Sequence, residues 1–315
     1  MQCLVLGGGG FIGSAIVDRL LRAGYPVRVF ERPRVAPFRS FEAHEQVDWV
    51  TGDLLSTRDV ENALDGVDTV FHLVSTTLPK GSNDDPIYDV QSNLVGTLQI
   101  LELMVRARTR KLVFISSGGT VYGPPQRLPI DELHPTDPQV SYGITKLAIE
   151  KYIQLFRRIH GLDATILRLA NPYGERQRIE TAQGAVAAFL HRALRDREVE
   201  IWGDGTVARD YVYIGDVAEA FFRAAHYRGP RDVFNIGSGR QTTLNELLES
   251  IERILGRSVG RRHLEGRSFD VKVNVLDVAL AKSELPWAPT VTLDDGLRKT
   301  AQWMQQADAT ARQIP

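Results

Sequence analysis

A glycine-rich segment near the amino terminus places the strongest constraint on the fold. The short apolar run at residues 1–6 predicts a buried strand, and Gly7, Gly10 and Gly13 follow it with GxxGxxG spacing. A helical pattern then continues to Gly24. Glycines in this order allow a tight turn, a close approach of backbone to a pyrophosphate and close packing of helix on strand, and the amino end of the helix faces the phosphates. The segment therefore predicts a dinucleotide site.

An acidic residue follows the second predicted strand. Glu31 lies where a carboxylate can hold the ribose hydroxyls, which favours NAD over NADP. Arg32 and Arg34 come immediately after it and could instead meet a 2′-phosphate, so both cofactors stay open at this point. Asp53, after the third predicted strand, could reach the adenine or could cap the next helix.

Short apolar strands alternate with helical patterns through the first half of the chain. The two longest predicted helices lie at about 86–108 and 141–160. The strands after the first are predicted at 27–30, 47–50, 69–74, 111–115 and 164–169. This βα repetition predicts an α/β fold with a doubly wound parallel sheet.

The rhythm becomes irregular after residue 174, so we expect a second, smaller domain interleaved with the first. Residues 1–172 are predicted to form the dinucleotide-binding Rossmann domain, and 210–240 to return to it. Residues 173–209 and 241–315 are predicted to form the C-terminal substrate domain. With 315 residues, 43% of them hydrophobic, the chain can bury a large core in one or two domains.

Charge and cysteine content narrow the function classes. The formal net charge is −1, which does not favour nucleic-acid binding by bulk electrostatics. The single cysteine, Cys3, lies in the first predicted strand, so no intramolecular disulfide can form and a reducing cytoplasm suits the chain. We find no apolar run of about 18 residues and no basic segment before the first strand, so neither a membrane span nor a signal peptide is indicated. We therefore expect a cytoplasmic protein.

Tyr142 and Lys146 form a YxxxK pair on the helix predicted at 141–160. Side chains at i and i+4 are neighbours on a helix surface. A nearby cation favours the phenolate, and so we expect Lys146 to lower the pKa of Tyr142 from its usual value of about 10. Tyr142 could then take a hydroxyl proton near neutral pH. The same spacing also occurs by chance on amphipathic helices, and the dinucleotide motif is what gives it weight here.

Several motifs in the right order resemble those of the extended short-chain dehydrogenase/reductase family, and within it the NAD-dependent nucleotide-sugar 4-epimerases. The segments that carry the resemblance are GGGGFIG at 7–13, Gly52-Asp53, Asn93 in NLVGT, SSGGTVYG at 116–123, YGITK at 142–146, RLANPYG at 168–174, WGDGTVARDYVYIGD at 202–216 and NIGSG at 235–239. The resemblance implies tightly held NAD, a smaller lobe that binds the nucleotide-diphosphate sugar, and a homodimer built on the helices at 86–108 and 141–160. No metal is expected.

The resemblance assigns roles residue by residue. Tyr142 looks like the catalytic base, and Lys146 looks like the residue that bonds the nicotinamide ribose and tunes that base. The other cofactor contacts that it implies are Gly7, Gly10, Phe11, Ile12, Gly13, Glu31, Arg32, Asp53, Leu54, Leu73, Val74, Ser75, Asn93, Ser116 and Ala170.

The substrate contacts that the resemblance implies lie mostly later in the chain. Asn171 looks like a ligand just beyond its strand. Arg209 and Arg267 look like the cations that grip the diphosphate, a task that suits a guanidinium fork. Arg209 could instead pair with an acidic neighbour such as Asp210. Asp270 would lie near the uridine ribose.

One departure from the family pattern concerns the catalytic hydroxyl. The family has a Ser or Thr where this chain has Gly118. Ser117 and Thr120 flank the gap and could donate to the sugar 4-oxygen, with Ser117 slightly favoured, although both could equally make loop hydrogen bonds. Gly118 and Gly119 also stand where dehydratases of the family have an Asp-Glu pair, which argues against elimination chemistry. Both glycines would line the substrate site.

We predict C4 epimerisation of a nucleotide-diphosphate sugar through a transient 4-keto intermediate. Asn274 stands where the family contacts the C2 substituent of the sugar. A Tyr there excludes N-acetyl groups and a small residue admits them, so Asn274 favours UDP-glucose and UDP-galactose but leaves UDP-N-acetylglucosamine open. A nucleotide-sugar 4-ketoreductase would use the same Tyr142 and Lys146 with a soluble cofactor. A non-enzymatic NAD sensor would have no need of that pair.

Overall fold

Seven parallel strands form the central sheet of the computed structural model, which describes residues 1–79, 81–177, 184–266 and 271–311. The strands are β1 (Cys3–Leu6), β2 (Val27–Glu31), β3 (Val47–Thr51), β4 (Thr69–His72), β5 (Lys111–Ser117), β6 (Asp163–Leu169) and β10 (Val233–Ile236). Their order across the sheet is β10-β6-β5-β4-β1-β2-β3, and every neighbouring pair is parallel. The strand order reverses between β1 and β4, and ligands bind at such a switch point beyond the carboxyl ends of the strands. The predicted doubly wound α/β fold is confirmed.

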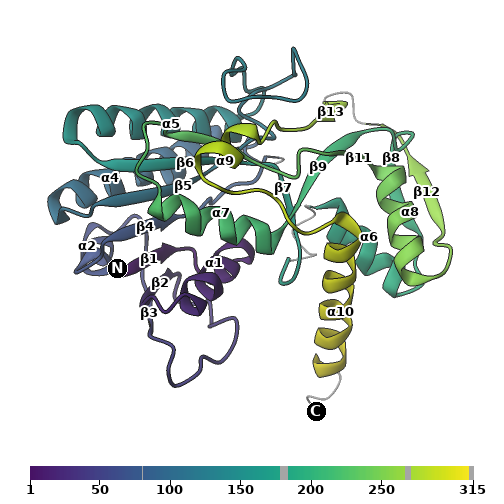
Figure 1. The fold of residues 1–315 in the computed structure, drawn as a ribbon, viewed down its shortest axis with the longest axis horizontal. Helices are drawn as coiled ribbons and strands as arrows, with labels where there is room; N and C mark the ends of the chain where they lie inside the picture. The colour runs from purple at the N-terminus through teal and green to yellow at the C-terminus, as the bar shows by residue number, and fades with distance from the viewer. Residues whose placement is uncertain (80, 178–183, 267–270, 312–315) are drawn as a thin grey trace.

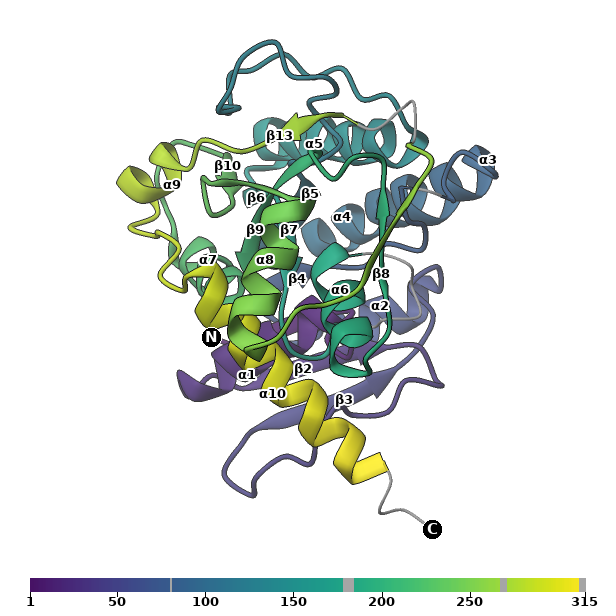
Figure 2. The ribbon, with the colours of Figure 1, turned by 90° about the vertical axis from the view of Figure 1, so that its right-hand side faces the viewer.

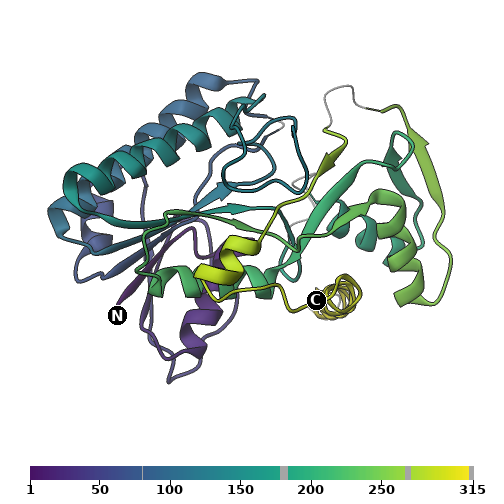
Figure 3. The ribbon, with the colours of Figure 1, turned by 45° about the horizontal axis from the view of Figure 1, so that its top comes forward.

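Helices cover both faces of this sheet (Figure 1, Figure 3). One face carries α1 (Phe11–Arg22) and α7 (Ile214–His226). The other face carries α2 (Thr57–Leu64), α4 (Gly96–Ala107) and α5 (Ser141–His160). In β1, Cys3 and Val5 pack toward the first layer, whereas Leu4 and Leu6 pack toward the second. A strand buried on both faces has to be apolar at every position, which explains the continuous apolar run at the start of the chain.

The helix predicted at 86–108 is present, but it is not regular throughout. It consists of α3 (Pro86–Asp89), the π-helical segment η1 (Val90–Val95) and α4. A π-helical turn is rare and often lies at a functional site. Here it separates the exposed start of the helix from the part that packs on the sheet.

A second lobe is built around strand β9 (Ala208–Tyr213). It pairs with β7 (Asn171–Tyr173), β11 (Gln241–Thr243) and β13 (Val273–Asn274). A separate parallel pair is formed by β8 (Val199–Trp202) and β12 (Arg261–Leu264). Three helices, α6 (Ala185–Leu194), α8 (Leu244–Leu255) and α10 (Leu293–Ala311), pack on one another beside these strands, whereas the short α9 (Ala279–Glu284) lies against β10 (Figure 2).

The predicted return of the chain to the main sheet holds for α7 and β10. Strand β9 belongs to the small sheet instead, and it runs across the division predicted between residues 209 and 210. The two-domain division stays a proposal, and the strand pairing supports a boundary after Tyr213.

Cys3 is fully buried, and burial raises the pKa of its thiol to about 12. It therefore packs as a small core residue. In the described part of the chain, no helix has the length and apolar character needed to span a bilayer.

Candidate functional site

The glycine loop connects β1 directly to α1. Gly7 has a φ of +83°, which favours glycine, and its N–H donates to the Phe30 carbonyl at 3.0 Å. The Gly10 N–H donates to the Gly7 carbonyl at 3.1 Å. A Cβ on Gly13 would lie only 2.1 Å from that same carbonyl oxygen, so a side chain does not fit there. The loop therefore presents only backbone atoms where a larger residue would fill the space expected for the pyrophosphate.

The amino end of α1 is open to an anionic ligand. Its N-cap, Gly10, has no side chain, and no acidic residue lies in the first turn. The first N–H groups of a helix have no partner within the helix and carry its positive dipole end. Phe11 and Ile12 form this turn, and both are half-buried. The arrangement fits a pyrophosphate.

A cleft of about 1150 Å³ opens beside the glycine loop. Its wall contains Gly9, Gly10, Phe11, Arg32, Pro33, Arg34, Val35, Ala36, Phe38, Thr51, Gly52, Asp53, Asp59, Arg176 and Trp303. Glu31 lies between two of these residues: one carboxylate oxygen accepts from Gly9 N–H at 3.0 Å and the other from Arg32 N–H at 3.2 Å. Glu31 therefore holds the loop at the place predicted for the ribose.

Asp53 lines this cleft and does not cap the next helix. Its Oδ1 accepts from the Leu55 N–H at 3.0 Å, and Ser56 is the residue that caps α2. The adenine contact predicted for Asp53 stays a prediction. Leu54 is partly buried against the core on the α4 side of the sheet.

Two residues of the cleft come from the second lobe and were missed by the sequence analysis. Arg176 follows β7, forms an ion pair with Asp18 at 2.8 Å, and its guanidinium carbon lies 4.5 Å from the centre of the Phe38 ring. Trp303 comes from α10. No motif or spacing marks either residue, because each reaches the cleft only through the packing of the two lobes.

The end of β4 lies directly against the glycine loop. The Leu73 N–H donates to the Leu6 carbonyl at 3.3 Å. Val74 is so close to Gly7 that a Cβ on that glycine would lie 3.2 Å from the Val74 Cγ2. Leu73 and Val74 thus border the position predicted for the nicotinamide side of the cofactor.

Asn93, in η1, fastens the loop that follows β4. Its Oδ1 accepts from the Thr76 N–H at 2.9 Å, and its amide donates to Thr77 Oγ1 at 3.0 Å and to Asp89 at 2.9 Å. Ser75 donates to the Thr77 carbonyl at 3.0 Å. The amide of Asn93 is thus engaged with protein, and its predicted cofactor contact would be made through the loop that it holds.

Lys146 is buried close to Tyr142. Its Nζ donates to the Ile115 carbonyl at 3.1 Å, near the carboxyl end of β5, and lies 5.7 Å from the centre of the Tyr142 ring and 4.8 Å from that of Phe114. Burial lowers the pKa of Lys146 to about 8, although the negative charge of Asp89 acts to raise it.

The prediction that Lys146 lowers the pKa of Tyr142 is wrong for the chain without a ligand. Burial, and after it the charge of Asp89, raises the pKa of the Tyr142 phenol to about 12. Removing a group from water disfavours its charged form, and this penalty outweighs the nearby ammonium. A further positive charge is needed before the phenol can act as a base near neutral pH.

Ser116 belongs to a buried ion-pair network behind the site. Its hydroxyl donates to Glu150 at 2.5 Å, and Glu150 also accepts from Arg168 Nη2 at 2.6 Å. Ser116 is 2% exposed and Glu150 is fully buried. The hydroxyl is thus committed to protein, and Ser116 is predicted to border the cofactor only by its position at the end of β5.

Leu276 explains why a glycine stands at position 118. A Cβ on Gly118 would lie 2.5 Å from Leu276 Cδ1 and 3.1 Å from its Cδ2. Two residues earlier, in β13, Asn274 Nδ2 donates to the Gly118 carbonyl at 3.2 Å. The second lobe therefore occupies the space in which the family's Ser or Thr would sit. Leu276 was missed, because nothing in its surrounding sequence indicates this contact.

The two hydroxyls that flank Gly118 are not equivalent. Thr120 Oγ1 is buried and has no hydrogen-bond partner among the described residues, whereas Ser117 is half-buried. Thr120 also lies beside the start of α5, since a Cβ on Gly143 would lie 2.8 Å from the Thr120 carbonyl oxygen. A buried hydroxyl without a partner costs free energy that a ligand can recover. The geometry favours Thr120, the reverse of the order suggested by the sequence. Gly119 lies between Ser117 and Thr120 in the sequence, and a Cβ built on Gly119 would lie 3.9 Å from Ser117 Oγ.

A smaller cavity of about 200 Å³ lies in the second lobe and brings Asn171 and Arg209 together. Asn171 donates to the Asp210 carbonyl at 3.1 Å, and Arg209 donates to the Val271 carbonyl at 2.7 Å. The other lining residues are Pro172, Tyr173, Gly184, Ala185, Val186, Trp202, Val207, Tyr211 and Leu244. Trp202 and Tyr211 were not predicted as ligands, although both lie in a segment that carried the family resemblance.

Four other predicted site residues lie apart from this cavity or outside the described ranges. Ala170 is buried after β6, and its N–H donates to the Ile236 carbonyl at 2.8 Å. Asn274 is 2% exposed, and its Oδ1 is buried without a partner among the described residues. Arg267 and Asp270 lie outside the described residues.

The chain is similar over nearly its whole length to enzymes of nucleotide sugars. The model of the NAD dependent epimerase/dehydratase family matches residues 3–237. The putative UDP-glucose 4-epimerase of Methanocaldococcus jannaschii is 35% identical, over 98% of this chain and 99% of that protein. The dTDP-4-dehydro-6-deoxyglucose reductase of Escherichia coli is 33% identical, over 94% and 95%. The crystal structure of the UDP-glucose 4-epimerase of Thermotoga maritima with UDP-glucose has a TM-score of 0.91 and 36% identity, over 98% and 99%.

These findings agree with the resemblance carried by the motifs. The family match begins in β1 and ends just beyond β10, so it spans the whole seven-stranded sheet. The relatives extend the similarity through the second lobe. This chain belongs to the NAD-dependent epimerase/dehydratase family.

Proposed function

We propose that this chain is an isomerase that epimerises C4 of a nucleotide-diphosphate sugar with NAD, and that UDP-glucose and UDP-galactose are its substrates. The observation that carries the proposal is the meeting of Tyr142 and Lys146 near the carboxyl end of β5. Thr120, whose hydroxyl has no partner among the described residues, lies next to the start of the same helix. Similarity along the full chain to UDP-glucose 4-epimerases supports it.

The glycine loop and the cleft beside it suit NAD. Gly13 keeps the loop free of a side chain, and the uncapped start of α1 favours a pyrophosphate. Glu31 stands beside the cleft for the ribose, and Lys146 would bond the second ribose. When bound there, NAD would supply the hydride acceptor and donor for C4 and, in its oxidised form, a positive charge at the site.

In this mechanism Tyr142 takes the proton of the C4 hydroxyl and later returns it. Lys146 remains charged and favours the phenolate. Thr120 donates a hydrogen bond to the sugar 4-oxygen in place of the family's hydroxyl at position 118, with Ser117 as the second candidate.

The nucleotide must stay bound while the 4-keto sugar turns about its diphosphate link. Arg209 and Asn171, which line one cavity, suit this role, and Arg267 and Asp270 are proposed to complete it. Holding the sugar through its nucleotide keeps the reacting carbon near the same groups for both half-reactions.

The choice of sugar depends on the surroundings of Asn274. Its amide nitrogen is bound to Gly118, and its buried Oδ1, which has no partner among the described residues, would accept a hydrogen bond from the sugar. A hydroxyl at C2 can donate this bond, and so can the N–H of an N-acetyl group. UDP-glucose and UDP-galactose are therefore proposed first, with UDP-N-acetylglucosamine as the alternative pair.

A nucleotide-sugar 4-ketoreductase is the second candidate. The similarity to the dTDP-4-dehydro-6-deoxyglucose reductase of Escherichia coli favours it. Such an enzyme would bind and release reduced cofactor in each turnover. A non-enzymatic NAD sensor would not need the Tyr142 and Lys146 pair, which argues against that alternative.

One experiment separates these candidates. The purified protein is analysed for retained NAD and assayed with UDP-galactose, without added cofactor, and then with a panel of UDP-, GDP- and dTDP-sugars. We expect retained NAD and formation of UDP-glucose, and no turnover by Tyr142→Phe. Turnover that requires added NADPH or NADH and stops at a reduced sugar would assign the chain to the ketoreductases.

The roles of Thr120 and Ser117 are tested by a pair of variants. We expect Thr120→Val to lower kcat by about tenfold or more, because it removes a donor to the reacting oxygen but keeps the side-chain shape. Ser117→Ala is expected to have the smaller effect. Equal rates for the wild type and both variants would contradict a relocated hydroxyl.

We also propose that the chain is a cytoplasmic homodimer. The helices predicted to form the interface carry exposed apolar side chains, which are Ile87, Tyr88, Val90, Val95, Ile144, Tyr152 and Ile159. A stripe of this kind is typical of a helix that packs against a partner. Light scattering of the wild type should give twice the mass of the chain, and Ile144→Glu should shift it to the monomer.

A further inference from the structure

The helix that carries Tyr142 has no cap of its own. Its N-cap, Val140, makes no side-chain cap, and no acidic residue lies in the first turn. Two side chains from the segment before α3 replace that cap. Ser82 Oγ accepts from the Tyr142 N–H at 3.0 Å, and Asn83 Oδ1 accepts from the Ser141 N–H at 2.9 Å. The amino end of α5 is thus held by a different part of the chain.

Asp89 completes this attachment and is itself fully buried. Its Oδ2 accepts from Ser141 Oγ and Thr145 Oγ1, each at 2.8 Å. Its Oδ1 accepts from the Asn93 amide at 2.9 Å and from Thr77 Oγ1. Burial acts to raise the pKa of Asp89, but these hydrogen bonds lower it below its usual value. The carboxylate is therefore a buried anion held by four uncharged donors.

Two of these donors are sequence neighbours of the catalytic candidates. Ser141 immediately precedes Tyr142, and Thr145 immediately precedes Lys146. A carboxylate at the amino end of a helix also interacts favourably with the helix dipole. Two hydrogen bonds on one turn of α5 fix the position of that turn relative to η1 and the loop after β4.

The other charged groups around Tyr142 do not duplicate the charge of Asp89. Glu150 on α5 is paired with Arg168, and burial lowers the pKa of His72 on β4 to about 3, so that His72 is neutral. The charged and titratable groups that face the pair are Asp89 from α3, Lys146 and Glu150 from α5, Arg168 from β6 and His72 from β4. Asp89 is the anion among them that has no cation in hydrogen-bond contact within the described residues.

We infer that Asp89 is a positioning residue of the reaction: it clamps the first turn of α5 through Ser141 and Thr145, and its charge keeps the Lys146 ammonium protonated. The inference rests on the proposed function, in which Tyr142 and Lys146 transfer the proton. It explains why an anion is buried next to a base: loss of the Lys146 proton would remove the cation that the phenolate needs.

The first test compares the pH profiles of kcat for two variants. Asp89→Asn keeps the shape but removes the charge, so the pKa values of Tyr142 and Lys146 both fall, and the whole profile should move to lower pH by about one unit. Ser141→Ala removes one clamp and keeps the charge, so kcat should fall by about tenfold without a shift. Asp85→Asn is the matched control, because the Asp85 side chain caps α3 by accepting from the Tyr88 N–H. Its profile should equal that of the wild type.

The second test does not depend on activity. Ring carbons of the tyrosines are labelled with ¹³C, the Tyr142 resonance is identified by its loss in Tyr142→Phe, and its titration is followed without substrate. Asp89→Asn should titrate about one unit below the wild type. If the enzyme assay fails but this shift is found, the proposed function is wrong and the electrostatic role of Asp89 stands. An unshifted titration together with an unshifted profile would overturn the inference.

A folding failure of Asp89→Asn would not end the test. The double variant Ser141→Ala, Thr145→Val removes both clamps on α5 and retains the anion. We expect a larger loss of kcat than with Ser141→Ala alone, at unchanged KM for the nucleotide sugar. Wild-type kcat in this variant would show that the clamp does not position the pair.

Discussion

Two lysines are buried against strand β5, one at each of its ends. Lys111, which begins β5, is 1% exposed, and Lys146, which lies against the far end of that strand, is 3% exposed. Burial lowers the pKa of each to about 8. Burial and pKa therefore do not distinguish them.

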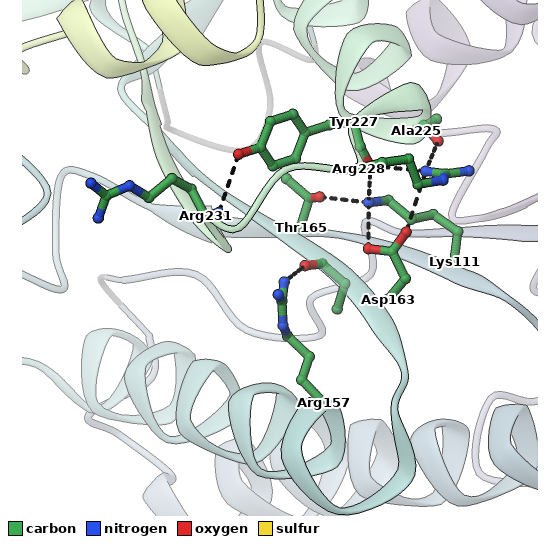
Figure 4. A network of polar contacts seen from close by, with 9 residues as sticks. Lys111, Arg157, Asp163, Thr165, Ala225, Tyr227, Arg228 and Arg231 are labelled. Carbon is green, nitrogen blue, oxygen red and sulfur yellow. Dashed lines mark hydrogen bonds and ion pairs between the residues drawn. The ribbon is translucent and has the colours of Figure 1, made fainter.

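The hydrogen bonds of Lys111 and Lys146 distinguish the two lysines. An ammonium has three donors. Lys111 donates to Asp163 Oδ1, Thr165 Oγ1 and the Tyr227 carbonyl, each at 2.9 Å (Figure 4). Lys146 makes one hydrogen bond within the described residues, to Ile115, and otherwise faces two rings. The saturated lysine ties β5 and β6 to the end of α7, and the unsaturated one keeps donors for a ligand.

Replacing Lys146 should produce the largest effect and should leave the fold intact. Lys146→Met fills a similar volume between the rings but removes the cation, so we expect kcat to fall by about 10²- to 10⁴-fold. The free energy of unfolding should not decrease, because a poorly compensated buried charge is lost. Steady-state kinetics and urea unfolding measure the two quantities. A destabilised but active variant would reverse the roles given to the two lysines.

The matching change at the other end of the strand should affect stability alone. Lys111→Met leaves three acceptors without their donor, and we expect a loss of about 2 kcal/mol in the free energy of unfolding. Arg228, which lies 3.3 Å from Asp163, keeps the loss moderate by pairing with the carboxylate. kcat should equal that of the wild type at a temperature at which both are folded. A fall in kcat at full folding would show that the network reaches the site.

The pH dependence of stability should separate Lys111→Met from the wild type in a defined window. The pKa of Lys111 is about 8 in the folded chain and has a usual value of about 10.4 in an unfolded one. Between these values the unfolded state binds more protons, so the stability of the wild type should rise with pH relative to the variant, by up to about 1 kcal/mol per unit. Urea unfolding at pH 7.5, 8.5 and 9.5 measures the difference. A constant difference would show that Lys111 has an ordinary pKa.

The smallest effect is expected from removing one of the acceptors of Lys111. Thr165→Val should cost about 1 kcal/mol, because the ammonium loses one of its three buried partners. Thr109 provides the matched control: its hydroxyl is buried without a partner among the described residues, so Thr109→Val should be neutral or slightly stabilising. Equal losses in the two variants would mean that the hydroxyl of Thr165 is not what matters.

The two lysines also show which features the sequence can predict and which it cannot. The YxxxK spacing singled out Lys146, because helical periodicity is local. Lys111 carries no such signal, because its partners lie at positions 163, 165 and 227. The direction of the pKa shift of Tyr142 was predicted wrongly for a related reason: spacing shows which charge is near, but the depth of burial decides which effect is larger.

The second lobe shows the same limit. The return of the chain to the main sheet was predicted from residue 210, whereas β9 (Ala208–Tyr213) pairs within the small sheet, because the sequence of a strand does not indicate its neighbours. The glycine at position 118 was noticed as a missing hydroxyl, but its cause, Leu276, lies more than a hundred residues away.

The sequence by itself determined the features that depend on neighbours along the chain. These are the strand, glycine loop and helix at the start, the alternation that predicts a parallel sheet, and the pairing of Tyr142 with Lys146 on one helix face. The tertiary structure alone decided which residues close the site: Leu276 at Gly118, Arg176 and Trp303 at the cleft, and Asp89 beneath α5. The physical reason is that hydrogen-bond saturation, burial and pKa depend on contacts between distant segments, and these exist only once the two lobes have packed.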